Sequence, residues 1–418
     1  MKQFVKRIMA ALLAGSLLVC CLAGCGQKNP ARADSEEPVT LTFWHTYSEG
    51  EEKVFLEKVV PGFEKANPGI KIDAIRMPLD GLQQQIITSS SGDAAPDVMR
   101  IDNTWVAEFA KLGALQDVSG FEDFDAVKAD MMDAPMATNY YNEGYYGIGL
   151  DTTTTVAVWN MDMLKQYGIT EPPTTMEGLV AMAKEHNDSA NEKWAFTIAG
   201  TYTWAMLPYF WGLGGELTDE SFTAATGYLN SDASVNALDT IAQWYKDGII
   251  SHAIIGEQPD AWGGMTGGQY AMISEGPWFF SSNDTDFECR TTVMPAGAGG
   301  SVSIVGGQDV VMSSNCKNQD AAWKFMKYLA SEEAQLAMAE AGMIPVTRSA
   351  VEKMNISETP YLEAYLDQLE TAKPRTPSAN WGQIDTLLGN AFEKAIRGEV
   401  SAKDALNQAA AEVDKLLK

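Results

Sequence analysis

The chain has 418 residues, of which 45% are hydrophobic and 21% are charged, and 56 acidic against 30 basic side chains give a formal net charge of −26. An acidic surface of this kind repels nucleic acid and predicts high solubility, and it disfavours an anionic ligand because no basic cluster is visible in the sequence. The three histidines and five cysteines show no metal-ligand spacing. The composition therefore argues against a zinc site, and we expect no cofactor.

The first 24 residues have the three parts of a secretory signal peptide: a basic start (MKQFVKR), an apolar run over residues 8–19, and small residues before Cys25. The apolar run is too short for a comfortable membrane span. The sequence L-A-G-C ending at Cys25 resembles the lipobox of bacterial lipoproteins, which implies cleavage at this point and a lipid on Cys25. We therefore expect residues 25–38 to be a lipidated, flexible stalk on the outer face of the cytoplasmic membrane. The alternative is a plain secretory signal with an incidental cysteine.

Cleavage would change the charge and the cysteine content of the chain. It would remove three basic residues and no acidic residue, which leaves 27 basic and 56 acidic side chains and a formal charge of −29. Two cysteines remain after the signal region, Cys289 and Cys316. They could form a disulfide outside the cytoplasm or stay as buried thiols, and the sequence does not decide between the two.

Strand and helix patterns alternate from residue 39 to residue 112. Hydrophobic periodicity predicts strands at 39–44, 70–75 and 96–102, a helix from the acidic segment SEGEE to Pro68, and further helices at 82–89 and 105–112. This alternation is typical of a doubly wound α/β lobe, which binds ligands beyond the carboxyl ends of its strands. Trp44 and His45 follow the first strand and Asp102 and Asn103 follow the third, so all four are candidate ligand contacts.

The rest of the chain contains two segments that we expect to cross between two domains. The first is an extended segment that comprises residues 145–150, then Asp151 with four threonines, and then residues 156–160. The second is the extended stretch 302–312. Residues 160–300 between them are mostly helical, a long helix is predicted at 319–341, and a final helix begins near Ser401.

A glycine-rich stretch, GGMTGGQYAMISEGPWFF, covers residues 263–280. It has neither the lysine nor the glycine spacing of a phosphate-binding loop. The pattern predicts a turn that leads into a buried strand, after which Glu275 and Trp278 lie over a cleft.

A set of short motifs then occurs in a recognisable order: F-W-H, F-E-K-x-N-P-x-I-K-I, A-P-D-V, Y-G-I-G-L-D, W-N-x-D-x-L, A-M-x-x-x-G-P-W and G-G-Q-D-V-V-M. Together they resemble the extracellular solute-binding proteins of ABC sugar importers, of the maltose-binding type. The resemblance covers nearly the whole mature chain. It implies a type II periplasmic-binding-protein-like fold, in which two doubly wound α/β domains are joined by a hinge with the ligand cleft between them. Residues 39–150 plus 302–348 would form the N-lobe, and 151–301 plus 349–418 the C-lobe.

The same resemblance implies a function and two platform residues. The chain would capture a mono- or oligosaccharide and deliver it to ABC permease subunits that work with a cytoplasmic ATPase, as a monomer and without catalysis. Asp151 and the segment near Gly306 would mark the hinge. In this family the tryptophan of A-M-x-x-x-G-P-W and an aromatic residue late in the chain stack on the sugar, and Trp278 and Trp381 match these positions.

The chemistry of a sugar independently favours such a site, because apolar C–H faces stack on aromatic rings while hydroxyl groups need hydrogen bonds. The candidate stacking residues are Trp44, Trp204, Trp211, Trp262, Trp278 and Trp381. The candidate polar and close-contact residues are His45, Asp102, Asn103, Asp151, Glu275, Gly306, Gly307 and Gln308.

Two other function classes remain open at this point. A binding protein of the same fold for a polyamine or metal would fit the acidic composition. A secreted glycosidase would need two carboxylates, for which Asp102, Asp151 and Glu275 are available. The sequence shows no nucleophile elbow, metal signature or triad-like spacing, so the carrier is the favoured interpretation.

Overall fold

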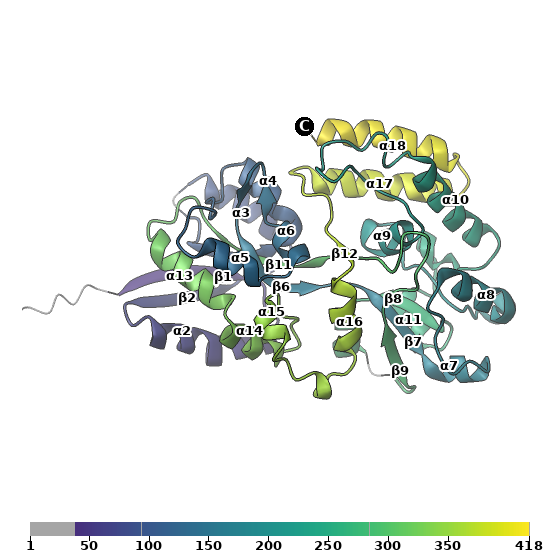
Figure 1. Ribbon diagram of the computed structural model, residues 1–418, viewed down its shortest axis with the longest axis horizontal. Helices are drawn as coiled ribbons and strands as arrows, with labels where there is room; N and C mark the ends of the chain where they lie inside the picture. Colours follow the sequence, from purple (N-terminus) through teal and green to yellow (C-terminus); the bar gives the residue numbers. More distant parts are fainter. Residues whose placement is uncertain (1–37, 93, 284, 418) are drawn as a thin grey trace, which may run out of the picture. The chain divides into compact units, whose positions relative to one another are not determined.

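The computed structural model describes residues 38–92, 94–283 and 285–417 (Figure 1). The predicted signal peptide, the lipid attachment at Cys25 and all of the predicted stalk except Pro38 lie outside these residues. Within the described part of the chain, no helix is both long enough and apolar enough for a membrane span. This part forms one compact unit.

The first of two main sheets has five strands in the order β2-β1-β3-β11-β6. These strands are β1 (Val39–His45), β2 (Ile70–Arg76), β3 (Val98–Asp102), β6 (Ile148–Thr153) and β11 (Gly306–Met312). β1 pairs in parallel with β2 and β3, as the alternating pattern predicts. β11 comes from a distant part of the sequence and runs antiparallel between β3 and β6. The sheet, with the helices on it, is the first lobe.

Helices cover both faces of the first sheet (Figure 1). Hydrophobic side chains pack on one face from α1 (Glu49–Val54), the π-helical turn Phe55–Val59, α2 (Val60–Ala66), α13 (Gln319–Leu329) and α14 (Glu332–Ala339). The other face is covered by α3 (Leu82–Ser90) and α4 (Val106–Lys111). The lobe is completed by α5 (Phe124–Asp130), α6 (Asp133–Ala137), α15 (Arg348–Val351) and the hairpin of β4 (Tyr140–Tyr141) and β5 (Gly144–Tyr145).

One helix of this lobe differs from its prediction. The pattern at 319–341 predicts a single helix, but the structure has two, α13 and α14, separated at Ala330 and Ser331. The Ser331 side chain accepts a hydrogen bond from the backbone N–H of Ala334. Serine is a strong N-cap because its oxygen satisfies a free N–H in the first turn, so a new helix begins here.

The second main sheet has three strands in the order β8-β7-β9. They are β7 (Val156–Asn160), β8 (Met272–Glu275) and β9 (Cys289–Thr292). Both pairings are antiparallel, so this lobe keeps the α/β class but differs from the parallel, doubly wound sheet that we expected. A long helical segment joins β7 to β8, and such a connection permits either strand direction.

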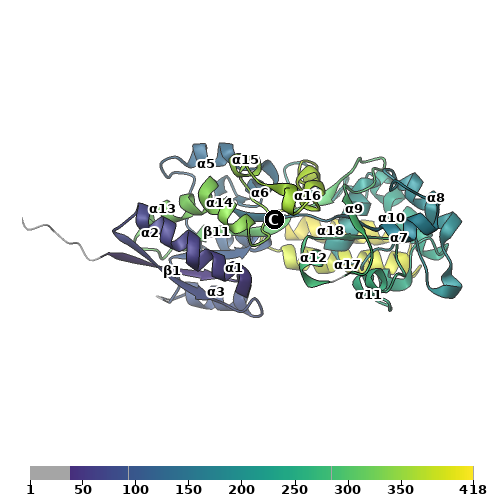
Figure 2. The same cartoon turned by 90° about the horizontal axis from the view of Figure 1, so that it is seen from below.

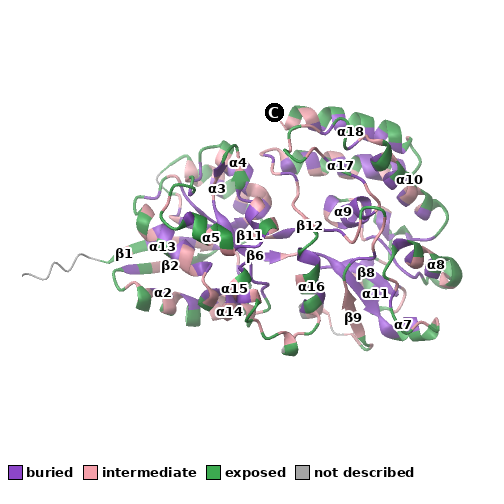
Figure 3. Ribbon diagram, viewed as in Figure 1, coloured by how far each residue is buried: buried purple, intermediate pink, exposed green. Residues whose placement is uncertain are grey.

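Helices surround the second sheet and form the second lobe with it. They are α7 (Met161–Gln166), α8 (Met176–His186), α9 (Thr203–Gly212), α10 (Asp232–Lys246), α11 (Ala261–Thr266), α12 (Trp278–Ser282), α16 (Leu362–Leu369), α17 (Trp381–Ile396) and α18 (Ala402–Leu416). α17 and α18 lie side by side in two perpendicular views (Figure 1, Figure 2). β7 and β8 are buried and β9 is intermediate, whereas exposed residues lie on outer helices such as α18 (Figure 3).

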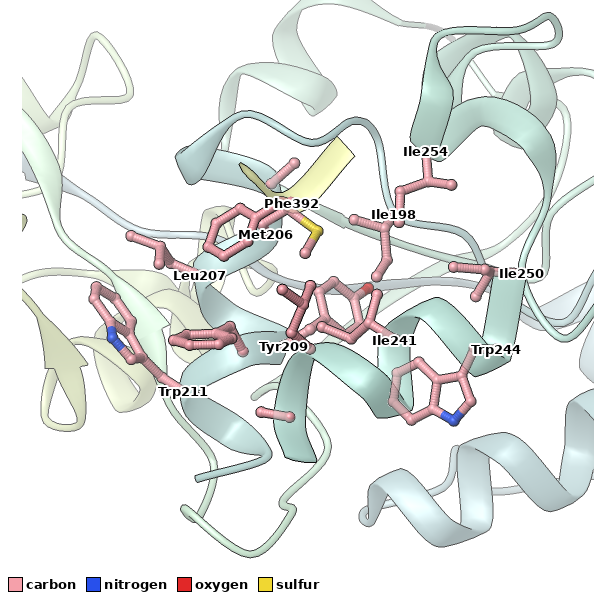
Figure 4. Packing of buried hydrophobic residues seen from close by; sticks show 14 of the residues in the cluster. Ile198, Met206, Leu207, Tyr209, Trp211, Ile241, Trp244, Ile250, Ile254 and Phe392 are labelled. Carbon is pink, nitrogen blue, oxygen red and sulfur yellow. The ribbon is translucent and has the colours of Figure 1, made fainter. Parts of the chain in front are cut away.

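The core of the second lobe is built around α9, a helix with buried residues on almost every side. Met206, Tyr209 and Trp211 of this helix pack near Ile241 of α10 and Phe392 of α17 (Figure 4). A helix that is apolar all round must lie in a core, and this position fixes its N-terminal end where the lobe meets the connecting segments.

Three segments connect the two sheets. The first runs from β6 to β7 through Thr154 and Thr155, and the second includes β10 (Ser303–Ile304) just before β11. The third runs from α15 of the first lobe to α16 of the second. β12 (Ala372–Lys373), between α16 and α17, pairs in parallel with β10. The first two are tied together because the Ser303 hydroxyl donates to the carbonyl of Thr155 at 2.7 Å. These segments lie beside the cavity described next.

Candidate functional site

A cavity of about 480 Å³ lies where the connecting segments meet strand ends of the first sheet and helix starts of the second lobe. Its lining combines aromatic, charged, glycine and apolar residues. The lining residues are Glu51, Arg100, Asp102, Asp151, Thr152, Thr153, Trp204, Pro277, Trp278, Gly306, Gly307, Gln308, Ala341, Gly342, Met343, Ile344, Tyr361 and Arg375.

Two tryptophans form an aromatic wall of the cavity. Trp204 is the second residue of α9 and Trp278 is the first residue of α12. Their ring centroids are 5.7 Å apart and their planes are inclined by 35°. The side chain of Trp278 remains 37% exposed, so an apolar ring face is open to a ligand. Tyr361 adds a third ring, which stacks on Phe280 at a centroid distance of 4.4 Å.

Each of these tryptophans lies directly against a glycine. A Cβ atom at Gly306 would come within 2.7 Å of the Trp204 ring, and one at Gly276 within 2.4 Å of the Trp278 ring. Real Cβ atoms do not approach other heavy atoms this closely, so a side chain at either glycine would displace the ring. Glycine is therefore needed at position 276 of the Glu275-Gly-Pro-Trp278 motif, because any side chain there would displace the Trp278 ring.

A row of polar residues crosses the end of the first sheet. Gln308 of β11 is paired in register with Asp102 of β3 on one side and with Asp151 of β6 on the other. All three line the cavity. The neighbouring Gly307 has a φ of +122° and lies so close to β6 that a Cβ would be 2.3 Å from the Asp151 carbonyl oxygen. Glycine tolerates this conformation, which lets β11 approach β6 at the cavity.

Asp151 forms a buried ion pair with Arg100. The Nη2 and Nε atoms of Arg100 lie 3.0 and 3.1 Å from Asp151 Oδ2, and its Nη1 donates to Thr46 Oγ1 at 2.6 Å. Burial raises the pKa of Asp151 to about 6, although the Arg100 guanidinium opposes this rise. Burial also disfavours charge on Arg100, but Asp151, Tyr47 and Glu51 together more than offset this and hold the pKa of Arg100 above its usual value. The pair is therefore ionised at neutral pH.

A second arginine reaches the cavity from the segment that follows β12. Nη2 of Arg375 donates to Asn103 Oδ1 at 2.8 Å and lies 3.9 Å from Asp102 Oδ1. Its guanidinium carbon is 5.7 Å from the centroid of the Trp204 ring, within the range of a cation–π contact. Burial lowers the pKa of Arg375, and Asp102 and Asp385 oppose this effect.

The structure brings together seven of the twelve residues that we predicted for the site. The residues that line the cavity are Asp102, Asp151, Trp204, Trp278, Gly306, Gly307 and Gln308. The lining does not include Trp44, His45, Asn103, Glu275 or Trp381. Asn103 is adjacent to it, because its side chain accepts the hydrogen bond from Arg375.

His45 and Trp44, at the end of β1, were predicted as ligand contacts but pack against other side chains of the first lobe instead. His45 is fully buried among the rings of Phe43, Tyr47 and Phe55. Desolvation, with the nearby positive charges of Arg100 and Arg76, lowers the pKa of His45 to about 4. Side chains alternate along a strand, so Trp44 lies on the opposite face and packs beside α3 and α4.

Three further tryptophans that we considered as platforms lie elsewhere. Trp381 is 6% exposed and Trp211 is 3% exposed, and both belong to the core of the second lobe (Figure 4 for Trp211). Trp262 donates from its indole Nε1 to Glu275 Oε2 at 2.6 Å. Large apolar rings are most often buried, and the position of a tryptophan in the sequence does not reveal whether its ring lies in the core or at the cavity.

The glycine-rich stretch also differs in detail from its prediction. Gly263 and Gly264 lie inside α11 rather than in a turn, and the turn follows at Gly267 and Gly268 before the buried strand β8. A Cβ at Gly264 would be 2.1 Å from the ring of Tyr270, so this glycine is needed for packing.

Sequence reasoning missed several residues of the cavity. Arg100 is the only basic residue within β3, and a charge inside a buried strand is a signal for a paired or functional group. Glu51 and Tyr361 gave no signal of this kind, since acidic residues and tyrosines are common in this chain. Arg375 is brought in only by the path of the segment after β12.

The two cysteines that could have formed a disulfide are both free thiols. Cys316 is buried in the first lobe and Cys289 is half-buried in β9. Burial raises the pKa of both thiols, so neither is activated as a nucleophile.

Comparison with curated proteins gives relatives over nearly the full length of the chain. The galactooligosaccharide-binding protein of Bacillus subtilis is 23% identical over 93% of this chain and 92% of its own length. A maltooligosaccharide ABC transporter solute-binding lipoprotein of Streptococcus pneumoniae is 26% identical over 98% of this chain and 96% of its own length. A putative binding protein of Brucella abortus is 23% identical over the whole of both chains.

Comparison with solved structures confirms the two-lobed α/β fold. The cyclic alpha-maltosyl-1,6-maltose binding protein from Arthrobacter globiformis matches with a TM-score of 0.81 at 23% identity, over 91% of this chain and 99% of its own. The sugar-binding protein MalE from Xanthomonas citri matches with a TM-score of 0.79 at 24% identity, over 91% and 97%. The family model for bacterial extracellular solute-binding proteins matches residues 58–364. The chain therefore belongs to the bacterial extracellular solute-binding protein family.

Proposed function

We propose that this protein is the substrate-binding component of an ABC importer and that it holds a carbohydrate in the cavity beside Trp204 and Trp278. The observation that carries the proposal is the pair of tryptophan rings, 5.7 Å apart, on the wall of a cavity that polar and charged side chains also line. The names of the curated relatives, which include galactooligosaccharide- and maltooligosaccharide-binding proteins, support it.

The energetics of sugar binding fit this lining. If each ring covers about 75 Å² of apolar sugar surface, burial at ~25 cal/mol/Å² contributes roughly 2 kcal/mol per ring. The ligand and the site lose freedom of motion on binding, which costs several kcal/mol of binding free energy. Hydrogen bonds must therefore supply much of the affinity and the specificity. Asp102, Gln308 and the paired Arg100 and Asp151 provide acceptors and donors for hydroxyl groups around this wall.

A second hollow next to the cavity favours an oligosaccharide over a single sugar. It measures about 620 Å³ and shares Glu51, Arg100 and Gln308 with the first cavity. From there it continues to the residues after β1 and β2, as far as Leu79. The cavity and the adjoining hollow together therefore have room for more than one sugar ring.

The alternative functions fit the geometry less well. A polyamine needs carboxylates that are free to pair with its positive charges, whereas Asp151 is paired with Arg100 and Asp102 lies 3.9 Å from Arg375. A glycosidase needs two available carboxylates. Asp151 is paired with Arg100, Asp102 Oδ1 accepts two hydrogen bonds from Thr104, and Glu275 is outside the lining, so the acids suit a binding role without catalysis.

The remaining parts of the proposal concern location and movement. The chain would be held at the outer face of the membrane by a lipid on Cys25, and as a monomer it would deliver its ligand to the permease. The lobes, 39–150 plus 302–348 and 151–301 plus 349–418, would close on a ligand that contacts both, which links affinity to closure. Replacing Cys25 by serine should release the protein from washed membranes, whereas retention would contradict the anchor.

Calorimetry on purified protein tests the binding function. Maltose, maltotriose and longer maltooligosaccharides, galactooligosaccharides, monosaccharides and spermidine are titrated, and each mixture is then checked for hydrolysis by chromatography. Stoichiometric binding of a sugar without product supports the proposal. Binding of spermidine alone, or turnover of an oligosaccharide, would overturn it. Trp278→Ala should weaken sugar binding, whereas Tyr228→Ala, which removes a similarly exposed ring outside the cavity, should not.

A further inference from the structure

We propose that Glu275 is a positioning residue, whose buried carboxylate holds the indole of Trp278 at the cavity wall and so prepares the stacking surface before the ligand arrives. The inference rests on the proposed function, because it concerns the platform of the same site. It assigns to Glu275 a role different from direct contact with a hydroxyl group, since Glu275 is 8% exposed and does not line the cavity.

The carboxylate of Glu275 accepts hydrogen bonds from three N–H groups. Oε2 receives the indole Nε1 of Trp262 at 2.6 Å, and Oε1 receives the backbone N–H of Gly276 at 2.8 Å. The indole of Trp278 lies so close to Gly276 that a Cβ there would be 2.6 Å from its Cε2 atom, and it is the third donor to this carboxylate. Among the described residues, Glu275 forms no ion pair with a basic side chain, so these N–H groups are what compensates its buried charge.

The position of the carboxylate is itself fixed by the fold. Glu275 is the last residue of β8 and is paired with Val156 of β7. Its backbone carbonyl accepts a hydrogen bond from the hydroxyl of Tyr365 in α16 at 3.0 Å. The ring of Trp262 packs edge-on against Phe279, with centroids 6.0 Å apart and planes at 82°. The acceptor therefore sits on a rigid strand end, between the helices α11 and α12.

Trp278 needs such an acceptor more than a core tryptophan does. It begins a helix of only five residues, and more than a third of its side chain is exposed. Van der Waals packing alone is weak for a ring of this kind. A hydrogen bond from the indole to a fixed carboxylate restricts the ring, so less motion is lost when a ligand binds. Glu275 and Trp278, separated by Gly276 and Pro277, thus act together as one unit.

The first part of the test needs no ligand. The protein is labelled with 5-fluorotryptophan, and the Trp278 resonance is assigned by its loss in Trp278→Phe. We expect Glu275→Ala to shift and broaden this resonance, and Glu275→Gln, which keeps one acceptor oxygen, to have a smaller effect. The matched control is Thr292→Val, which removes the acceptor of the Trp159 indole outside the cavity, a hydrogen bond of 2.9 Å. It should leave the Trp278 resonance unchanged. An unchanged Trp278 resonance in Glu275→Ala would overturn the proposal.

The second part uses maltotriose as the probe and a double-mutant cycle. Glu275→Ala should weaken binding about 10-fold, within the range expected for loss of an aromatic anchor. In a Trp278→Ala background the same substitution should have no further effect, because the ring that it positions is gone. Equal losses in both backgrounds would show that Glu275 acts independently and would refute the proposal. If maltotriose does not bind the protein at all, the proposed sugar class fails, while the fluorine spectra still decide the role of Glu275. If Glu275→Ala does not fold, Glu275→Gln serves in both parts.

Discussion

Arg375 and Asn103 join the two lobes beside the cavity. The guanidinium Nη2 of Arg375, in the segment after β12, donates to Oδ1 of Asn103, directly after β3, at 2.8 Å. The same guanidinium lies 5.7 Å from the Trp204 ring, so one side chain connects the strand end of the first lobe with the aromatic wall of the second.

Arg375→Gln should therefore lower the free energy of unfolding by about 1 to 3 kcal/mol, because it leaves the buried acceptor of Asn103 unpaired. Urea denaturation of Arg375→Gln, Asn103→Ala and the double variant measures the coupling between the two residues. We expect the double variant to lose less stability than the sum of the single losses. Strict additivity would show that the hydrogen bond contributes nothing to stability.

Gly276→Ala should displace the Trp278 ring without unfolding the protein. The new Cβ would come within 2.4 Å of the ring, and because the ring is partly exposed it can be displaced toward solvent. Calorimetry with a bound sugar should show a loss of about 1 to 2 kcal/mol, within the range of aromatic anchors. Gly382→Ala is the matched control, since nothing lies within 4 Å of its new Cβ. Unchanged affinity in Gly276→Ala would mean that the ring position is not important for binding.

Arg100→Met should be strongly destabilising, by about 3 to 5 kcal/mol, because it leaves the Asp151 carboxylate buried without its partner. Adding Asp151→Asn should recover part of the loss. The pKa of Asp151 is raised to about 6, so its carboxyl group is mostly neutral in the folded protein below pH 6 and mostly ionised above it. The penalty of Arg100→Met should therefore be smaller at pH 5 than at pH 8. Denaturation at both pH values checks this, and an equal penalty would show that Asp151 is not responsible.

His45 should make the protein less stable in acid. Its pKa is lowered to about 4 in the fold against 6.5 unfolded, so the unfolded chain binds more protons between these values. The contribution is fully present above pH 6.5 and is lost as the pH falls through 4, and it amounts to about 2 to 3 kcal/mol. Urea denaturation at pH 7 and pH 4.5 should show a smaller pH effect in His45→Gln than in the parent protein. The exposed His252→Gln should behave like the parent.

The local elements of the first lobe are predictable because each one shows its own periodicity. Leu41 and Phe43 are buried and alternate with less buried neighbours along β1, and Ser48 with Glu51 forms a capping box where α1 begins. Residues 156–160 were predicted only as the end of an extended segment, and the structure makes them the strand β7. The division of residues 319–341 into two helices was not predicted, because the apolar spacing continues across the break and only the cap at Ser331 marks it.

The candidate site was predicted in part, and the particular residues show why. Trp278 and Gln308 stand at strand ends or in motifs with a recognisable order, so the sequence points to them. Trp381 stands in a matching position, but its ring turns into the core of the second lobe. Arg375 has no local signal at all and reaches the cavity through the pairing of β12 with β10.

The sequence by itself therefore determined the α/β class, the resemblance to sugar-binding receptors and the set of strand ends from which a site can be built. These depend on periodicity and motif order, which are properties of neighbouring residues. Only the tertiary structure decided that Trp204 and Trp278, rather than Trp381, form the aromatic wall, and that Glu275 faces two indoles instead of the cavity. The direction of a side chain depends on the packing of segments far apart in the chain, such as Gly306 against Trp204, and local patterns do not contain that information.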